Sequence, residues 1–198
     1  MKTTSAKFDF SDLIIEKYEI YNYRHASTIL RSDFPTEYAQ LTELLENFDL
    51  TREDIQAQGG RKSPIASKFD AKLYSTGWEE KLWNISLEID GKKNPFPTHH
   101  VDYYKNRIAV ELEWNNKDTF FDRDLNNFRL LHQLGIISVG IIVTRSDKLQ
   151  KVFNTLGKGK SYGTSTTHTG KLLPKIVGGG SAECPVLVFG ISEACVKK

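Results

Sequence analysis

A chain of 198 residues has the length of one ordinary domain, and its 39% hydrophobic residues can build a substantial core. The formal net charge of +2 neither predicts nor excludes a polyanionic partner, because basic residues can gather on one surface and carboxylates elsewhere. No stretch approaches the roughly 20 apolar residues of a membrane span, and the N-terminus lacks a signal-peptide core, so we expect a cytoplasmic protein without a membrane partner.

Two cysteines, Cys184 and Cys195, flank an apolar run near the C-terminus. If that run is an extended strand, the two residues lie roughly 35 Å apart and cannot form a disulfide. Their spacing also lacks a metal-binding pattern, so we expect free thiols, which suit a reducing compartment.

Apolar periodicity and turn residues divide the first half of the chain into strands and helices. Leu41, Leu44 and Leu45 recur at helical spacing, and a second helix opens at Ser63-Pro64 and ends at Gly77. In chain order, the expected elements are a strand at 14–23, a helix at 34–48, a basic flexible loop at 58–62, a helix at 64–75, and strands at 82–89, around 101 and at 107–114.

In the second half, residues 136–144 (IISVGIIVT) form the most apolar run and follow a helix directly, which predicts a buried, parallel strand. The expected elements are a helix at 120–134, this strand, a helix at 147–156, a loop at 157–170, a short helix at 171–177, a turn at 178–180 and a strand at 185–192. We find no repeat or linker that divides the chain. The order therefore predicts one α/β domain over residues 1–198 with a mixed sheet.

Three carboxylates lie close together in residues 99–114. In a strand at 107–114, one face carries Ile108, Val110, Leu112 and Trp114, and the other carries Ala109, Glu111 and Glu113. Asp102 precedes a tight polar connection that would bring it back beside Glu111. Two or three carboxylates suffice to bind Mg²⁺, an ion that activates water and stabilises charge on a phosphoryl group.

A simpler interpretation makes Glu111 and Glu113 the solvated face of an amphipathic strand, and Asp102 a turn residue. The helix and buried strand that follow favour a sheet covered on both faces, where an unpaired Glu is costly. A bound metal ion would remove that cost.

Asp102, separated by eight residues from Glu111-Leu112-Glu113, resembles the PD-(D/E)xK nuclease signature. The chain is similar, more narrowly, to the BamHI/BglII/BstYI group of type II restriction endonucleases, in which Glu or Gln replaces the usual lysine, as Glu113 does here. Pro97 precedes Asp102 by five residues, so the chain has no literal Pro-Asp pair. The resemblance covers most of the chain and includes Ser63-Pro64, Gly77-Trp78, Lys160-Ser161-Tyr162 and the closing strand at 185–191.

This resemblance implies catalytic roles for specific residues. Asp102 and Glu111 would bind Mg²⁺, for which Mn²⁺ would substitute, and Glu113 would orient or deprotonate the attacking water. A further polar residue is expected shortly after a Trp such as Trp78. Glu80 is the best candidate, and Glu79 is the alternative.

The resemblance also implies a restriction-endonuclease-like core, in which helices flank a central mixed β-sheet. The protein would act as a homodimer on double-stranded DNA, cut a short palindromic site and leave 5′-phosphates. A cognate DNA methyltransferase is expected, and a GATC core is a lead for the site. The alternatives are a PD-(D/E)xK nuclease of DNA repair or phage defence, and a catalytically silent DNA-binding protein of the same fold.

Polar residues after the catalytic strand are candidates for DNA contact. Asn115, Asn116 and Lys117 follow it directly, and Arg123 lies on the next helix. Asn can pair with adenine, and Lys can reach guanine or phosphate. The alternative for the first group is a capping loop in which Asn116 or Asp118 caps the helix; for Arg123 it is surface solvation.

The loop at 157–170 is the second DNA-facing candidate. Lys158 and Lys160 suit phosphates, whereas Ser161, Thr164 and Ser165 can also read base edges. Its Gly and Lys residues lack the spacing of a Walker A motif, and the other interpretation is a mobile surface loop. His99 and His100 are adjacent and would point to opposite faces of a strand, which argues against a zinc site.

Overall fold

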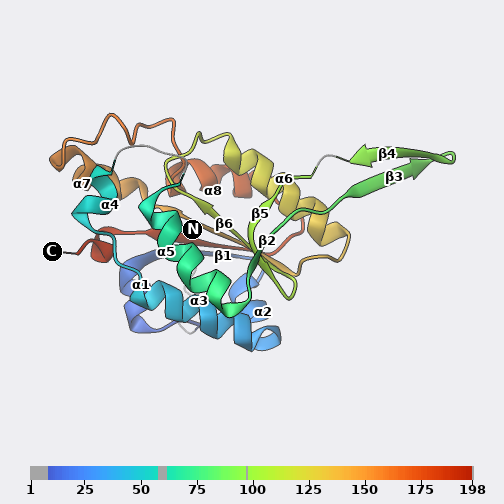
Figure 1. Cartoon of the computed structure of the whole chain (residues 1–198), viewed down its shortest axis with the longest axis horizontal. Helices are drawn as coiled ribbons and strands as arrows, with labels where there is room; N and C mark the ends of the chain where they lie inside the picture. The colour runs from blue at the N-terminus through green and yellow to red at the C-terminus, as the bar shows by residue number, and fades with distance from the viewer. Residues whose placement is uncertain (1–8, 58–61, 97, 198) are drawn as a thin grey trace.

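The computed structural model describes residues 9–57, 62–96 and 98–197, and a mixed β-sheet forms its centre (Figure 1). Among these residues, six strands pair in the order β1-β8-β7-β6-β5-β2. β6, β7 and β8 run parallel, while the remaining strands join in antiparallel pairs. The strands are β1 (Tyr18–Tyr23), β2 (Glu79–Lys81), β5 (Val101–Lys105), β6 (Ile108–Glu113), β7 (Val139–Arg145) and β8 (Val186–Ile191). The mixed α/β sheet and the parallel strand expected at 136–144 are confirmed.

Helices cover both faces of the sheet, because both faces are apolar (Figure 1). Val110, Ile141 and Phe189 belong to the core of one face, and Ala109 and Ile142 to the core of the other. The first face packs against α1 (Asp12–Lys17), α2 (Ala26–Asp33), α3 (Pro35–Asn47), α4 (Arg52–Gln56), α5 (Pro64–Leu73) and α7 (Gln150–Thr155). The second packs against α6 (Phe120–Gln133) and α8 (Thr169–Val177).

α6 lies unusually close to the sheet. Phe121, Leu125 and Phe128 are buried beneath it, as their helical spacing predicts. Gly140 on β7 allows this approach, since a Cβ atom there would lie 2.3 Å from Cδ2 of Phe128. The absence of a Cβ atom at Gly140 therefore lets α6 pack close to the sheet and to the carboxylates of β6.

A two-residue turn joins β5 to β6. Asn106 and Arg107 both have positive φ values, 42° and 70°, as the tight turns of β-hairpins require. The register pairs Tyr103 with Val110 and Lys105 with Ile108. Continued by one residue, it brings Asp102 beside Glu111, as the sequence predicts.

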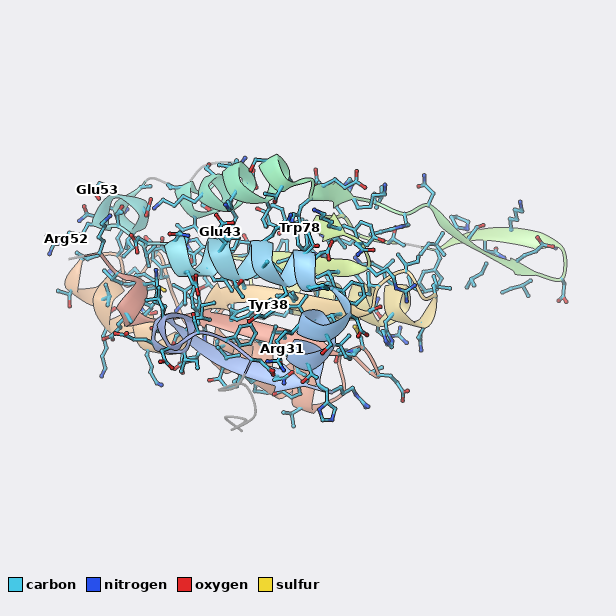
Figure 2. All side chains as sticks on the ribbon, turned by 90° about the horizontal axis from the view of Figure 1, so that it is seen from below. Arg31, Tyr38, Glu43, Arg52, Glu53 and Trp78 are labelled. Carbon is cyan, nitrogen blue, oxygen red and sulfur yellow. The ribbon has the colours of Figure 1, made fainter. Side chains whose placement is uncertain are left out.

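α5 begins and ends at the residues expected from sequence. The Ser63 side chain accepts a hydrogen bond from the Ala66 amide at 3.1 Å, and Pro64 occupies the first turn. A short 3₁₀ turn, η2 (Tyr74–Thr76), leads to Gly77 at φ 87°. Trp78 follows, buried, and its indole N–H donates to Gln40 of α3 at 2.9 Å (Figure 2).

Two expected strands differ from the structure. Only the second half of the strand expected at 14–23 is extended, because Ser11 caps the helical turn of α1 and accepts from the Ile14 amide. The strand expected at 82–89 exists as β3 (Ile85–Ile89), but it pairs with β4 (Lys92–Phe96) in a hairpin that projects from the body (Figure 1). The sequence patterns did not predict α1, α2, α4, β2 or β4.

The helix boundaries in the second half of the chain differ in part from those expected. α6 has Thr119 as its N-cap residue without a side-chain cap, so the cap expected from Asn116 or Asp118 is wrong. The helix expected at 147–156 divides into η3 (Asp147–Leu149) and α7, and α8 starts at Thr169, earlier than expected. Residues 58–61 of the expected basic loop lie outside the described residues. Cys184 and Cys195 are buried and free, as expected.

None of the described helices combines the length and the apolar character needed to cross a membrane.

Candidate active site

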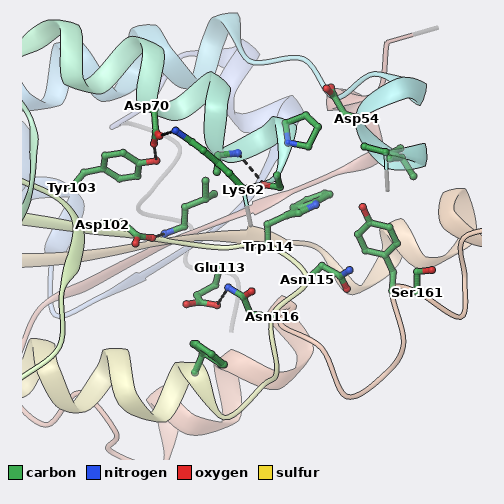
Figure 3. Close-up of a pocket in the computed structure, with 18 of the residues that line it drawn as sticks. Asp54, Lys62, Asp70, Asp102, Tyr103, Glu113, Trp114, Asn115, Asn116 and Ser161 are labelled. Carbon is green, nitrogen blue, oxygen red and sulfur yellow. Dashed lines mark hydrogen bonds and ion pairs between the residues drawn. The ribbon is translucent and has the colours of Figure 1, made fainter. Parts of the chain in front are cut away.

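A cleft of about 900 Å³ opens at the ends of β5 and β6 (Figure 3). α5, the beginning of α6 and the loop around Ser161 form its walls. Its volume is in the range of ligand sites in proteins. Charged and polar side chains are prominent in its lining, among them Lys62, Asp70, Glu80, Asp102, Glu113, Asn115, Asn116, Arg123, Lys158 and Ser161.

Asp102 on β5 and Glu111 on β6 are held together by backbone hydrogen bonds. The Asp102 amide donates to Oε2 of Glu111 at 3.3 Å, and Oδ2 of Asp102 accepts from the Leu112 amide at 2.9 Å. Asp102 lines the cleft, whereas Glu111 is fully buried behind it. Oε1 of Glu111 has no hydrogen-bond partner among the described residues. The predicted proximity of these two carboxylates is confirmed.

Glu113 lies on the same face of β6 as Glu111 and is 2% exposed, at the wall of the cleft. Asn116 donates to its Oε2 at 2.8 Å (Figure 3). Nη2 of Arg123 lies 3.4 Å from its Oε1. Its carboxylate is therefore held between the end of its own strand and α6.

A fourth acidic residue, Asp124 of α6, completes this cluster. Asp124 is fully buried, and its Oδ1 accepts from Nε and Nη2 of Arg123 at 3.0 and 2.9 Å. The guanidinium also lies 4.3 Å from the centre of the Phe120 ring. Arg123 thus spans Asp124 and Glu113 at the mouth of the cleft.

Burial and mutual repulsion shift the titration of this cluster. Burial, and then the charges of Asp124 and Asp102, raise the pKa of Glu111 well above its ordinary value. Burial and Asp124 likewise raise the pKa of Glu113. Burial raises the pKa of Asp124 too, although Arg123 offsets part of that rise. The cluster therefore favours bound protons or a bound cation over several bare negative charges.

The donor chemistry of the cluster fits a hard divalent cation. Asp102, Glu111 and Glu113 offer oxygen atoms, which Mg²⁺ prefers, and the free Oε1 of buried Glu111 needs a partner. Asp102 and Glu111 are the residues that could hold such an ion. The described residues do not, however, contain three His, Cys, Asp or Glu side chains already arranged around a metal position.

Glu80 and Glu79, the two candidates for an upstream acidic residue, lie on β2 at the edge of the sheet. Glu80 lines the cleft and stays largely exposed, with its Oε1 3.4 Å from Nδ1 of His100. Glu79 pairs instead with Lys81 at 2.8 Å. Their placement brings Glu80, but not Glu79, to the cleft.

The residues predicted to contact DNA after β6 divide into two groups. Asn115, Asn116 and Arg123 line the cleft. Lys117 is exposed and outside the lining. It forms an isolated β-bridge with Thr166 of the loop between α7 and α8, residues 156–168, which we call the later loop.

The later loop divides in the same way. Lys158 and Ser161 line the cleft, whereas Lys160, Thr164 and Ser165 are exposed beyond its lining. Hydrogen bonds join this loop to the segment after β6: Thr167 N donates to the Asn116 carbonyl at 2.8 Å, and Asp118 N to the Ser165 carbonyl at 3.1 Å. The two regions predicted to face DNA therefore form one connected surface.

Sequence reasoning missed two parts of the site. Asp124 carried a signal, since it stands three residues after Phe121 on the apolar face of α6, where an acidic residue is unexpected. On the opposite wall, Asp70 of α5 forms an ion pair with Lys62 and accepts a hydrogen bond from the Tyr103 hydroxyl at 2.5 Å (Figure 3). Nothing in the local sequence indicates that pairing.

The adjacent histidines, His99 and His100, have different neighbours. His99 lines the cleft, and burial, together with Arg123, lowers its pKa to about 4. His100 faces Glu80. Among the described residues, neither histidine belongs to a group of three or more potential metal ligands.

Comparison with known proteins identifies the family. No curated protein matches the chain. The family model of restriction endonuclease BglII/BglIII matches residues 18–191, from the first residue of β1 to the last of β8. The matched part includes every strand of the central sheet and the acidic cluster of the cleft. The chain therefore belongs to the BglII/BglIII family of restriction endonucleases and is a type II site-specific deoxyribonuclease whose substrate is double-stranded DNA.

Proposed function

We propose that this enzyme hydrolyses DNA phosphodiester bonds with Mg²⁺, held by Asp102 and Glu111, and that Mn²⁺ can substitute. The observation that carries the proposal is the Asp102–Glu111–Glu113 cluster, which combines two cleft-lining carboxylates with a fully buried one whose Oε1 finds no partner among the described residues. A bound divalent ion supplies charge neutralisation at the phosphate and activation of a water molecule.

The protein's own residues would orient and stabilise the reacting groups. Glu113 is fixed by Asn116 and Arg123, so its carboxylate is available to orient the attacking water or accept its proton. Glu80 enters the same cleft from β2 and is the candidate for the upstream acidic role. Arg123 lies at the mouth, where a guanidinium suits a DNA phosphate.

DNA would lie across the connected surface formed by the segment after β6 and the later loop. Asn115, Asn116 and Ser161 are our candidates for base contacts, because their amide and hydroxyl groups can pair with base edges. The lysines of these two segments, and the hydroxyl side chains beyond the cleft lining, would bind phosphates and set affinity more than sequence choice. These are Lys117, Lys158, Lys160, Thr164 and Ser165.

We further propose a single nuclease domain over residues 1–198 that functions as a cytoplasmic homodimer. Two-fold symmetry in the protein matches a palindromic site, with each subunit cutting one strand and leaving a 5′-phosphate and a 3′-hydroxyl. A GATC core remains a lead for that site. A cognate DNA methyltransferase would protect host DNA.

Digestion of unmethylated phage DNA with the purified protein, with and without Mg²⁺, tests this function. Discrete Mg²⁺-dependent fragments whose sequenced ends share one palindrome are expected. Ragged cutting without a common sequence would instead favour a repair or defence nuclease. DNA binding that persists in EDTA, with no nicking in Mg²⁺ or Mn²⁺, would indicate a silent DNA-binding protein.

A further inference from the structure

Arg145, the last residue of β7, is a buried cation to which the cleavage chemistry assigns no role. It is 1% exposed, and among the described residues it forms no ion pair and leaves its Nε without a partner. Burial lowers the pKa of Arg145 to about 10, and Tyr162 and Asp147 offset part of that effect. The guanidinium is therefore charged at neutral pH, and a buried charge requires compensation.

That compensation comes from the loop that reaches the cleft. Nη2 of Arg145 donates to the carbonyls of Tyr162 and Gly163, both at 3.3 Å, and to Oγ1 of Thr166 at 2.9 Å. Thr166 in turn donates to the Gly163 carbonyl at 2.9 Å. The loop thus closes around one guanidinium nitrogen, Nη2, whose two hydrogens are shared among the three acceptors.

An aromatic cluster provides the loop with a second anchor. The Tyr162 ring stacks on Phe153 of α7 at 4.0 Å between centroids and lies 5.8 Å from Trp114. Arg145 lies 5.4 Å from the centroid of the same Phe153 ring. Tyr162 is therefore held inward, while its neighbour Ser161 lies in the lining of the cleft.

The loop is also tied to the strand that carries Glu113. Thr167 and Thr144 both donate to the Glu113 carbonyl, at 3.2 and 2.8 Å. The Asn116 amide donates to Oγ1 of Thr167 at 3.1 Å. Thr144 directly precedes Arg145, so the end of β7 is joined both to the later loop and to Glu113 of the catalytic strand.

We propose that Arg145 is a positioning residue for DNA recognition, which holds residues 158–167 in the shape that presents Lys158 and Ser161 to DNA in register with Asn116. The inference rests on the proposed function, because it assumes that this surface contacts bases. A base contact is directional, so a shift of the loop should weaken discrimination between sequences more than it weakens the chemistry at Glu113.

Two variants and a control test the inference. Arg145→Met keeps most of the buried volume and removes all three hydrogen bonds. Thr166→Val removes the side-chain acceptor for Arg145 and the hydroxyl's own bond to the Gly163 carbonyl, leaves the two carbonyl acceptors in place, and serves if Arg145→Met fails to fold. Thr155→Val is the control, because among the described residues the exposed Thr155 hydroxyl bonds only to the Lys151 carbonyl within α7.

Hydrogen exchange by mass spectrometry and cleavage of short duplexes give two independent readouts. The duplexes carry the site found from phage DNA ends, or that site with one base pair changed. In both test variants we expect faster amide exchange in residues 116–118 and 158–167, with β7 and β8 unchanged. We expect the ratio of kcat/KM between the two duplexes to fall about tenfold, the scale of one good base contact. Thr155→Val should match wild type in both measurements.

Unchanged exchange in the loop of Thr166→Val would overturn the inference. So would faster exchange without any loss of sequence discrimination, because it would make Arg145 a purely structural residue. A wild-type protein that does not cut DNA contradicts the proposed function instead, and the exchange measurement distinguishes that failure from failure of the Arg145 assignment.

Discussion

Asp102 and Glu111 are the residues whose loss should affect cleavage most. Asp102→Asn or Glu111→Gln should reduce cleavage by more than about 10²-fold, since removing a metal ligand removes several kcal/mol of charge stabilisation. Specific DNA binding should survive, because neither side chain belongs to the proposed DNA-reading surface. Plasmid cleavage and an electrophoretic binding assay measure the two effects.

Glu88→Gln is the matched control for this prediction. Glu88 is an exposed carboxylate on β3, in the projecting hairpin, and its strand position pairs with Lys93. Near-normal cutting by Asp102→Asn or Glu111→Gln, or an equal loss in Glu88→Gln, would contradict the assignment.

The same buried carboxylates should cost the fold some stability. In EDTA, Glu111→Gln should have a higher Tm than wild type, and its free energy of unfolding should be larger by about 1 kcal/mol or more. The reason is that a neutral amide relieves the repulsion by Asp124 and Asp102. The single oxygen of the new amide can still accept the hydrogen bond that the Asp102 amide now donates to Oε2 of Glu111. Added Mg²⁺ should raise the wild-type Tm and leave that of the variant nearly unchanged, since only bound ligand stabilises.

Differential scanning calorimetry measures this difference. A variant less stable than wild type in EDTA would mean that the charge repulsion at Glu111 is already relieved within the protein.

Residue-level prediction from sequence succeeded where the contact is local. A two-residue turn and strand alternation suffice to place Asp102 beside Glu111, because both are properties of a short stretch of chain. Asp124 and Arg145 could not be assigned in this way. Asp124 is joined through its neighbour Arg123 to Glu113 of β6, and Arg145 bonds to Tyr162 of the later loop, so only tertiary packing decides these contacts.

At the scale of elements, the contact of α6 with β7 decides where the acidic cluster forms. Gly140→Ala should destabilise the protein by about 1–3 kcal/mol, because the new methyl group would overlap the Phe128 ring. Cleavage should fall as well, since lifting α6 moves Arg123 away from Glu113. Urea unfolding and plasmid cleavage measure both changes.

A second substitution separates this overlap from other causes. Phe128→Leu replaces the ring with a smaller side chain, so the double variant Gly140→Ala/Phe128→Leu should recover part of the stability lost in Gly140→Ala. Strictly additive losses in the double variant would show that Phe128 is not what the methyl group meets.

Element prediction worked best for long, strongly periodic segments. α3, α5, α6 and the buried β7 were all expected near their observed bounds, because their apolar spacing extends over several turns or a whole strand. The 14–23 segment was too short for alternation to outweigh the Ser11 cap, which makes its first part helical. Sequence alternation also could not show that β3 pairs with β4 rather than with the central sheet, because pairing is a property of the whole fold.

At the scale of the whole molecule, the described residues bring the acidic cluster together at a single cleft, and each subunit of the proposed dimer would use this cluster to cut one strand of DNA. In the proposed homodimer, a second cluster related by two-fold symmetry would cut the other strand of a palindrome. In such a dimer, each subunit would cut its own strand independently of the other, although both subunits bind the same DNA site.

Mixed dimers test that independence directly. A dimer with one wild-type and one Glu111→Gln subunit, separated by differently tagged subunits, should convert supercoiled plasmid to the nicked circle and stop there, because its second strand faces a disabled site. The wild-type homodimer should continue to linear DNA, and the Glu111→Gln homodimer should leave the plasmid supercoiled. Linear DNA formed by the purified mixed dimer at the wild-type rate would mean that one subunit cuts both strands, and the two-fold arrangement proposed for this enzyme would have to be abandoned.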